Sequence, residues 1–199
     1  MARTVSLRQS CSGCAKPVRV RLICAVLSLL SPWALADEAL QLNARGTVQV
    51  AFTPGDDAAG LVIAAVSKAR RQVLVQTYSF THPEIAQALV DAKRRGVDVQ
   101  VIADPRQMET IATSRVEWLA EQGVPLWVDG EHAAAHNKVM IIDNGFADAV
   151  LLTGSFNFTQ AAQYRNAENL LLLRGNPNLV EAYAANWRRH KIHALPFRR

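Results

Sequence analysis

The sequence predicts an α/β domain with layered α-β-α architecture, built on a mixed, mostly parallel sheet. Two observations lead to this fold class. Short runs rich in valine, isoleucine and leucine alternate with longer segments in which apolar residues recur at helical spacing. Residues 37–199 contain no repeat, linker or low-complexity stretch that would mark a second domain. We therefore expect a single domain over 37–199.

The first half of this domain is predicted to hold three strands separated by two helices. Pro54 closes the first strand, and Asp56 and Asp57 supply an N-terminal cap for the helix that follows. Pro83 suits the first turn of the second helix, and Gly96 ends that helix after three basic residues. The predicted elements are strands at 47–52, 72–78 and 97–103, and helices from Asp57 to about Arg71 and from Pro83 to Arg95.

The second half is predicted to continue this alternation and to add a hairpin. Its two strands, at 138–142 and 149–153, are separated by a polar segment that contains Gly145, which favours an enlarged turn. The other predicted elements are a helix from Ser114, a strand at 124–128, a short helix at 158–164, a strand at 168–173 and a helix from Asn176.

Residues 1–36 are typical of a secretory signal peptide. They contain five basic residues and no acidic residue, an apolar run at 22–30, and Ala34 and Ala36 as the small residues that a signal peptidase reads. A membrane-spanning helix needs roughly 20 apolar residues, so this run favours a cleaved signal over the alternative, an uncleaved anchor. We expect a periplasmic or secreted protein with no stable membrane association after cleavage.

The basic charge and the cysteines belong to the same segment. The chain has 22 basic and 17 acidic residues, so removing five basic residues leaves 17 of each kind in residues 37–199. The high pI is therefore no evidence of nucleic-acid binding. Cys11, Cys14 and Cys24 all precede residue 37, and Cys11 and Cys14 without a second pair are a weak indication of a metal. The mature domain has no cysteine, so its stability must come from its core.

The candidate site lies in two short segments, His136-Asn137-Lys138 and Gly154-Ser155-Phe156-Asn157. Side chains two apart on an extended chain point to the same face, so His136 and Lys138 emerge together, and Ser155 and Asn157 repeat this geometry. An imidazole, an ammonium, a hydroxyl and a carboxamide supply a nucleophile or acid and several donors for anionic oxygens. The set contains no metal-ligand cluster. It predicts a site that handles phosphate without a metal or another cofactor.

These segments resemble the HxKxxxxD and GSxN motifs of the phospholipase D superfamily, and in particular its small secreted nucleases with a single motif. The likeness extends over most of the chain after residue 46, through Phe52-Thr53-Pro54, Gln76-Thr77-Tyr78, Arg95-Gly96-Val97 and Asn166-Ala167-Glu168-Asn169. The resemblance implies a phospholipase D-like fold. It also implies a metal-independent phosphodiesterase that acts through a phosphohistidine. One departure is that Asp143 and Gly154 are farther apart than is usual in the family.

The resemblance assigns the central roles to His136, Lys138 and Glu168. A nucleophilic imidazole must present one unprotonated nitrogen, and a carboxylate commonly holds the other N–H. Glu168 is the candidate carboxylate, because the matching residue of the family contacts the catalytic histidine. Lys138 is predicted to contact the phosphate oxygens, and Ser155 and Asn157 are predicted either to contact these oxygens or to position Lys138.

Two further residues are predicted to have structural roles at the site. Asp143 lies an odd number of positions after Lys138, so on a regular strand it faces away from the phosphate, and we expect it to hold the adjoining turn or strand. Gly154 belongs to the matched motif and is expected to have a structural role at the site.

The mechanism requires two imidazoles, whereas the chain has one His-x-Lys sequence. We therefore predict a homodimer in which His136 of each subunit flanks one phosphate. The alternative is a monomer in which another histidine or a water serves as the acid. His132 is a weak candidate for a site role, and His82, His190 and His193 are predicted to be ordinary surface residues.

The leading functional prediction is a non-specific endonuclease that cleaves DNA, with RNA as a further substrate left open. A phospholipase D-type hydrolase of phosphatidyl lipids or cardiolipin is the alternative. A DNA-binding protein with an inactive site is less favoured, because all the polar residues expected for catalysis are present.

Overall fold

The computed structural model describes residues 39–198. The predicted signal peptide, 1–36, lies outside the described residues. Gln41–Arg199 forms one compact unit, and the elements described below belong to it.

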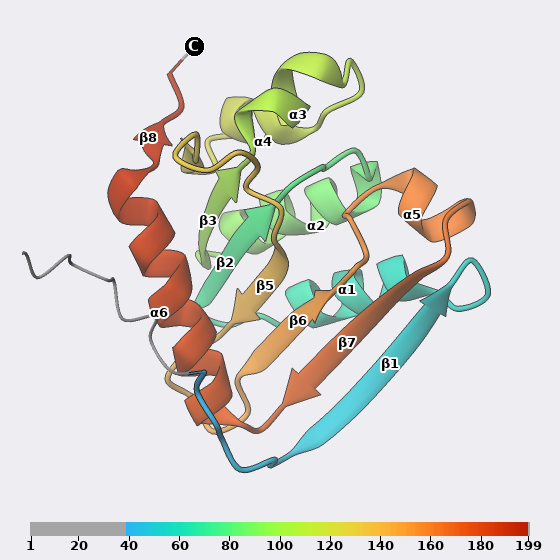
Figure 1. Cartoon of the computed structure of the whole chain (residues 1–199), viewed down its shortest axis with the longest axis vertical. Helices are drawn as coiled ribbons and strands as arrows, with labels where there is room; N and C mark the ends of the chain where they lie inside the picture. The colour runs from blue at the N-terminus through green and yellow to red at the C-terminus, as the bar shows by residue number, and fades with distance from the viewer. Residues whose placement is uncertain (1–38, 199) are drawn as a thin grey trace, which may run out of the picture. The chain divides into compact units, whose positions relative to one another are not determined.

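Eight strands of this unit form one sheet (Figure 1). They are β1 (Thr47–Thr53), β2 (Gln72–Thr77), β3 (Asp98–Ala103), β4 (Leu126–Val128), β5 (Lys138–Ile142), β6 (Val150–Gly154), β7 (Glu168–Arg174) and β8 (Leu195–Pro196). Their order across the sheet is β1-β7-β6-β5-β2-β3-β4-β8. The first strand of the chain therefore lies at one edge, beside one of the last.

The sheet is mixed, as predicted, but the prediction that it is mostly parallel is wrong. β2 is parallel to β3 and β3 to β4, whereas all other neighbouring strands are antiparallel. A parallel pair needs a connection that crosses a face of the sheet. The helix between β6 and β7, α5 (Gln160–Tyr164), is short and remains beyond the strand ends (Figure 1). The chain therefore turns back, and β7 pairs antiparallel with β6.

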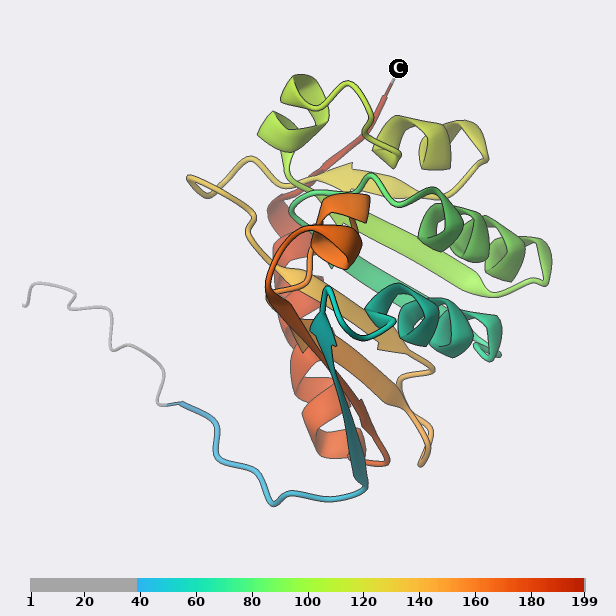
Figure 2. The same cartoon turned by 90° about the vertical axis from the view of Figure 1, so that its right-hand side faces the viewer.

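Helices cover both faces of the sheet, which confirms the layered α-β-α prediction (Figure 2). One face carries α1 (Ala58–Ser67) and α2 (Pro83–Arg94), and the other carries α6 (Pro177–His193). The larger core lies under α1 and α2 and includes Val66, Leu89 and Met140. The smaller core lies under α6, where Trp187 donates a hydrogen bond from Nε1 to the Val75 carbonyl at 2.9 Å.

Most predicted elements are present with small changes of boundary, and α4 (Val116–Glu121) corresponds to the helix predicted from Ser114. Two elements have no predicted counterpart: α3 (Pro105–Thr110) and β8. Both are too short to show a period. The N-cap of α3 is nevertheless visible in the sequence, because Asp104 precedes Pro105 and accepts a hydrogen bond from the Gln107 N–H.

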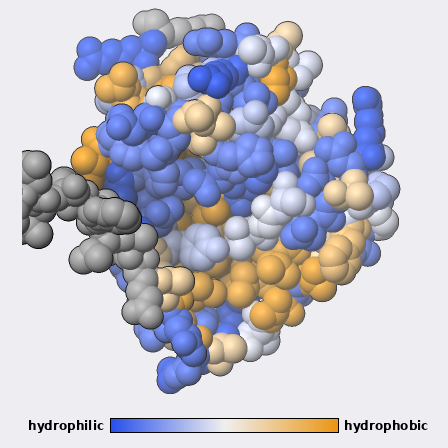
Figure 3. All heavy atoms as spheres, in the orientation of Figure 1, coloured by the Kyte–Doolittle hydropathy of each residue, from blue (hydrophilic) through white to orange (hydrophobic). Residues whose placement is uncertain are grey.

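An exposed apolar patch covers the outer strands on the face that carries α6. Val48, Val50 and Phe52 of β1 are 61%, 49% and 59% exposed, and Val48 and Val50 pair with the half-buried Leu173 and Leu171 of β7. We call these five residues the β1–β7 patch. Figure 3 shows hydrophobic surface over these strands. α6 packs on β2, β5 and β6 and leaves β1 and most of β7 uncovered. No helix in the described part of the chain is long and apolar enough to cross a membrane.

Candidate active site

The residues predicted to form the site gather along the border of the sheet that is formed by one set of strand ends, which we call the site edge. β1, β2 and β6 end at this edge, whereas β5 and β7 begin there, as the pairs Thr53–Glu168 and Thr77–Lys138 show. The edge therefore joins segments that are far apart in the sequence. The predicted residues placed along it are His136, Lys138, Ser155, Asn157 and Glu168.

His136 precedes β5 and lies between Tyr78 and Lys138. Its ring centroid is 4.3 Å from that of Tyr78, with the two planes at 55°. Lys138 Nζ lies 3.1 Å from His136 Nδ1 and donates to the His136 carbonyl at 2.7 Å. The Tyr78 N–H donates to the Asn137 carbonyl at 2.9 Å, which fixes the segment that enters β5. His136 is exposed, so its imidazole can reach a bound substrate.

Lys138 is buried although it carries an ammonium group, with 7% of its surface exposed. Its Nζ lies 4.8 Å from the centre of the Tyr78 ring, a cation–π contact. Burial lowers the pKa of Lys138 from 10.5 to about 8, and the attraction of Glu168 offsets this only in part. At neutral pH the side chain is therefore mostly protonated, so it can donate to an anionic oxygen.

Gly154 ends β6 in a conformation that positions Ser155. Its φ is 153°, and a Cβ atom at this position would lie 2.3 Å from the Asn169 carbonyl oxygen. Only glycine allows so close an approach of the two strands. Ser155 Oγ then accepts hydrogen bonds from the Asn169 N–H at 3.0 Å and from Asn169 Nδ2 at 3.3 Å. The buried Phe156 donates its N–H to the Asn169 carbonyl at 3.1 Å.

Asn157 and Glu168 complete the edge. Asn157 is half-buried, and its side-chain oxygen is buried without a hydrogen-bond partner among the described residues. Glu168 accepts a hydrogen bond from Asn166 Nδ2 at 3.0 Å, and Thr53 Oγ1 donates to the Asn166 carbonyl at 3.1 Å. No hydrogen bond joins Glu168 to His136 in the described part of the chain. The orienting role of Glu168 stays a prediction.

Asp143 lies at the opposite ends of the strands, just after β5. It is five positions after Lys138, which is about 16 Å along a strand at 3.3 Å per residue. Its carboxylate accepts hydrogen bonds from the backbone N–H groups of Arg70, Arg71 and Gln72, at 2.7–3.1 Å. Burial alone would raise the pKa of Asp143, but these hydrogen bonds outweigh it and lower the pKa below the ordinary value. Asp143 thus holds the loop that leads into β2.

The other histidines differ from their predicted surface positions. His82 is 3% exposed, and its Nδ1 lies 2.9 Å from Glu84. His190 and His193 are half-buried beside Asp129. The expectation that all three are ordinary surface residues is therefore wrong. The His82 N–H donates to the Phe158 carbonyl at 3.0 Å, and α6 carries His190 and His193 to Asp129. Tyr78 is the site residue that sequence reasoning left without a role, although its position at the end of a predicted strand placed it at this edge.

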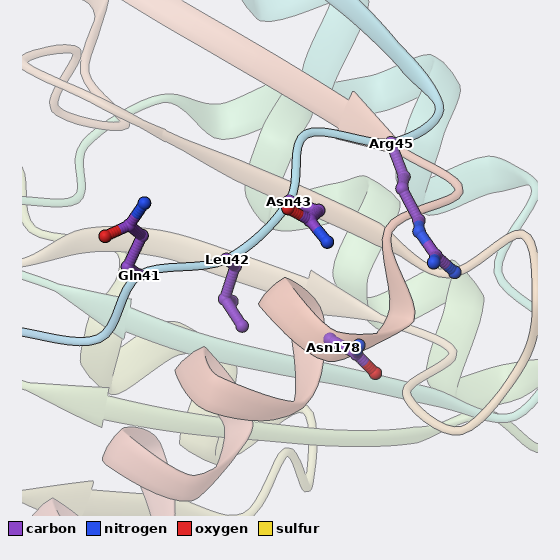
Figure 4. A pocket seen from close by; sticks show the side chains of 5 residues that line it. All are labelled: Gln41, Leu42, Asn43, Arg45 and Asn178. Atoms are coloured by element: carbon purple, nitrogen blue, oxygen red, sulfur yellow. The ribbon is translucent and has the colours of Figure 1, made fainter.

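A hollow of about 440 Å³ lies away from this edge, between the segment before β1 and the start of α6 (Figure 4). It is lined by the side chains of Gln41, Leu42, Asn43, Arg45 and Asn178. This lining has neither a nucleophile nor a general acid. β1 begins at this end and finishes at Thr53 beside Glu168, so the hollow and the candidate site occupy opposite ends of the strands.

Comparisons with known proteins found a family model and curated relatives that match this chain. Residues 62–191 match the family described as "Cardiolipin synthase, PLD-like domain". The chain is 33% identical over 171 residues to a protein named phospholipase D from Rickettsia conorii, covering 82% of each chain. It is 30% identical over 134 residues to a mitochondrial cardiolipin hydrolase from Xenopus tropicalis, of which it spans 61%.

Solved structures give the same result for the fold. The phospholipase D family member Nuc from Salmonella typhimurium superposes with a TM-score of 0.72 at 36% identity, over 78% of this chain and all of that one. NucT from Helicobacter pylori has a TM-score of 0.69 at 23% identity, which supports the fold alone.

The fold and these relatives define the class of the protein as a phosphodiester hydrolase. The chain belongs to the phospholipase D superfamily.

Proposed function

We propose that this protein is a secreted or periplasmic endonuclease that cleaves DNA without sequence preference and without a catalytic metal, and that RNA is an additional candidate substrate. The observation that carries the proposal is the meeting of His136, Lys138, Ser155 and Glu168 at one open edge of the sheet. His136 and Ser155 are exposed there, so the phosphodiester of a long polymer can reach them from solvent. The resemblance to the small nucleases also extends beyond the motif.

The proposed reaction has two steps of in-line displacement at phosphorus. In the first, an unprotonated nitrogen of His136 bonds to phosphorus, the bond to the leaving oxygen breaks, and a second imidazole protonates that oxygen. In the second step, the second imidazole takes a proton from water, the water oxygen bonds to phosphorus, and His136 is released. Lys138 offsets the negative charge of the equatorial oxygens throughout.

Substrate binding supplies a reason for His136 to change its proton position. When the Lys138 ammonium donates to Nδ1, the proton of the neutral imidazole resides on Nε2, which cannot attack. A phosphate oxygen competes for the ammonium and withdraws it from Nδ1. Nδ1 can then carry the proton and donate a hydrogen bond to Glu168, which leaves Nε2 unprotonated and free to attack. Glu168 already interacts with Lys138 electrostatically, so the three groups form one coupled set.

A homodimer would supply the second imidazole. Among the described residues, His132, His190 and His193 surround Asp129, and His82 contacts Glu84. No hydrogen bond or ring contact joins any of these four histidines to His136 in this part of the chain. The β1–β7 patch ends at Phe52, next to Thr53 and Glu168 of the site edge. A second copy seated on this patch about a two-fold axis parallel to β1 would bring the two site edges together, and would cover apolar surface that is otherwise exposed.

The same patch favours the second candidate function, a phospholipase D-type lipid hydrolase. Exposed valine and phenylalanine side chains beside a phosphate site could also contact a lipid surface. The names of the Rickettsia and Xenopus relatives fit this alternative. Purified protein should be assayed on plasmid DNA, RNA, phosphatidylcholine vesicles and cardiolipin vesicles in parallel. Turnover of a lipid with no cleavage of nucleic acid would overturn the nuclease proposal.

Mixed dimers test the shared centre. Wild-type and His136→Ala chains are combined through different affinity tags, and the heterodimer is isolated by two successive purifications. A centre that needs both imidazoles loses nearly all multiple-turnover activity in the heterodimer, whereas two independent sites retain about half. Sedimentation at the assay concentration provides the control. An active monomer in that experiment would exclude the dimer.

Chelation tests the catalytic use of metal. No metal-ligand set occurs at the site edge in the described part of the chain, so cleavage should continue in excess EDTA. Loss of cleavage in EDTA that returns only on addition of Mg²⁺ would refute a metal-free reaction.

A further inference from the structure

A group of four metal-ligand residues lies outside the catalytic edge. Asp129 and His132 lie in the loop after β4, while His190 and His193 occupy the last turn of α6. We call these four residues the Asp129 cluster. One possible ligand atom from each residue lies within 4.8 Å of those of the others. Figure 1 shows the end of α6 and the loop after β4 on the same side of the sheet.

The carboxylate at the centre is completely buried and is contacted by two imidazoles. His190 Nδ1 lies 2.7 Å from Asp129 Oδ2, and His193 Nε2 lies 3.2 Å from Asp129 Oδ1. The His132 ring is 5.2 Å from the His190 ring and 5.4 Å from the His193 ring, measured between centroids. Three imidazoles thus converge on one buried carboxylate.

The nitrogen of His193 that faces the cluster has no hydrogen-bond partner. His193 Nε2 is buried, although 30% of the side chain is exposed, and its 3.2 Å contact with Asp129 Oδ1 is an ion-pair distance rather than a well-formed hydrogen bond. A buried nitrogen without a partner is uncommon and calls for an explanation. A cation at the centre of the cluster would accept its lone pair.

The spacing of the four residues suits a small tetrahedral cation. His190 and His193 are three apart on a helix, so they are neighbours on its surface. In a tetrahedral site with bonds of about 2.0–2.1 Å to zinc, ligand atoms are about 3.3 Å apart. His190 Nδ1 lies 2.7 Å from Asp129 Oδ2 and His193 Nε2 lies 3.2 Å from Asp129 Oδ1. The ligand atoms all lie within 4.8 Å of one another, so closing the widest of these separations by about 1.5 Å would bring the four into range. Imidazole and carboxylate ligands in this geometry favour zinc.

We propose that Asp129, His132, His190 and His193 bind one Zn²⁺ ion with a structural role. Four protein ligands leave no open position for water or substrate, so the ion takes no part in the cleavage. It joins the loop after β4 to the C-terminal helix. His132 is four residues before His136, so their Cα atoms are at most about 14 Å apart. The ion would therefore restrain the loop that presents the nucleophile.

Metal content and thermal unfolding test the proposal. The full chain, purified without a histidine tag, is stripped with a chelator, supplied with one equivalent of Zn²⁺ and dialysed against metal-free buffer. We expect about one retained zinc per chain and a higher melting temperature than for the stripped protein. Substituted Co²⁺ should give the intense visible absorption of a tetrahedral complex.

Single substitutions assign the metal to this cluster. His132 is exposed, so His132→Ala should fold normally, and it should bind Zn²⁺ at least about tenfold more weakly, because even outer-shell changes have effects of this size. His193→Ala should behave likewise. Ile192→Ala is the matched control, because Ile192 lies between the two helix ligands but is 85% exposed; it should bind as wild type does.

Two results would overturn the proposal. One is the absence of retained zinc together with an unchanged melting temperature in the wild type. The other is equal binding by the wild type, His132→Ala and His193→Ala, which would place the ion elsewhere, including at the cysteines of residues 1–36. Because these measurements do not depend on activity, they remain informative even if the proposed nuclease function fails.

Discussion

The buried ammonium of Lys138 should make the wild-type protein less stable than a variant that lacks it. Lowering the pKa from 10.5 to about 8 corresponds to about 3 kcal/mol, since one pH unit is worth about 1.4 kcal/mol. The unfolded chain holds this proton more tightly than the native chain does. The penalty is therefore complete below pH 8, and it decreases as the pH rises from 8 towards 10.5.

Lys138→Met removes the charge while keeping a long, unbranched side chain. Its loss of the hydrogen bond to the His136 carbonyl subtracts about 1 kcal/mol, so we expect the free energy of unfolding to rise by about 2 kcal/mol at pH 7. The gain should shrink at pH 10. Catalytic activity should be lost, because the charge that faces the phosphate is gone. Urea unfolding at both pH values, at equal protein concentration, measures the effect.

The exposed Lys68 provides the control, because Lys68→Met should change stability little and equally at both pH values. The reasoning would be refuted if Lys138→Met were less stable than the wild type at pH 7. It would also fail if the difference between Lys138→Met and the wild type were the same at pH 7 and pH 10.

Three further predictions concern the rest of the site and its support. Glu168→Gln should lower turnover by orders of magnitude with little effect on substrate affinity. It should also move the alkaline limb of the pH–rate profile to lower pH, because it removes an attraction that raises the pKa of Lys138. Near-wild-type turnover would contradict the role assigned to Glu168. Gly154→Ala places a Cβ atom 2.3 Å from a carbonyl oxygen and should lower the free energy of unfolding by more than about 2 kcal/mol. In the control Gly145→Ala the new Cβ atom meets nothing within 4 Å, so the loss should be about 1 kcal/mol. Equal losses for the two variants in urea unfolding would argue against the clash. Asp143→Asn should lower the free energy of unfolding by about 1–3 kcal/mol at pH 7. Because the folded pKa of Asp143 is depressed, the advantage of the wild type should be present above the unfolded pKa and disappear as the pH falls through the folded pKa. A difference that persists at low pH would show that charge is not the cause.

The order of elements and the location of the site could be predicted from the sequence. Strong local patterns, such as the alternation at 47–52 and the buried run at 138–142, define most strands, and the His-x-Lys and Gly-Ser-x-Asn segments place the chemistry at strand ends. The direction of β7 could not be predicted in this way. It depends on whether α5 crosses the sheet, and the sequence of α5 has no signal for its position relative to other elements.

Contacts between distant segments were also outside the reach of sequence patterns. The predicted structural role of Asp143 follows from its parity on the strand, but its partners at Arg70–Gln72 depend on the packing of another loop. The Asp129 cluster was missed for the same reason. His190 and His193 show a helical spacing of three, yet only the packing of α6 against the loop after β4 gives them a common partner.

The pairing of β1 with β7 also determines when a newly made chain can complete its sheet. Thr47 pairs with Arg174 and Thr53 with Glu168, so the first strand waits for a partner that is synthesised more than a hundred residues later. Such distant contacts are slow to form, because the intervening chain must first be brought together. A ribosome-bound chain that has not yet exposed β7 has no Glu168 beside Lys138. A chain that stops before β7 therefore lacks both the partner strand of β1 and the carboxylate that interacts with Lys138.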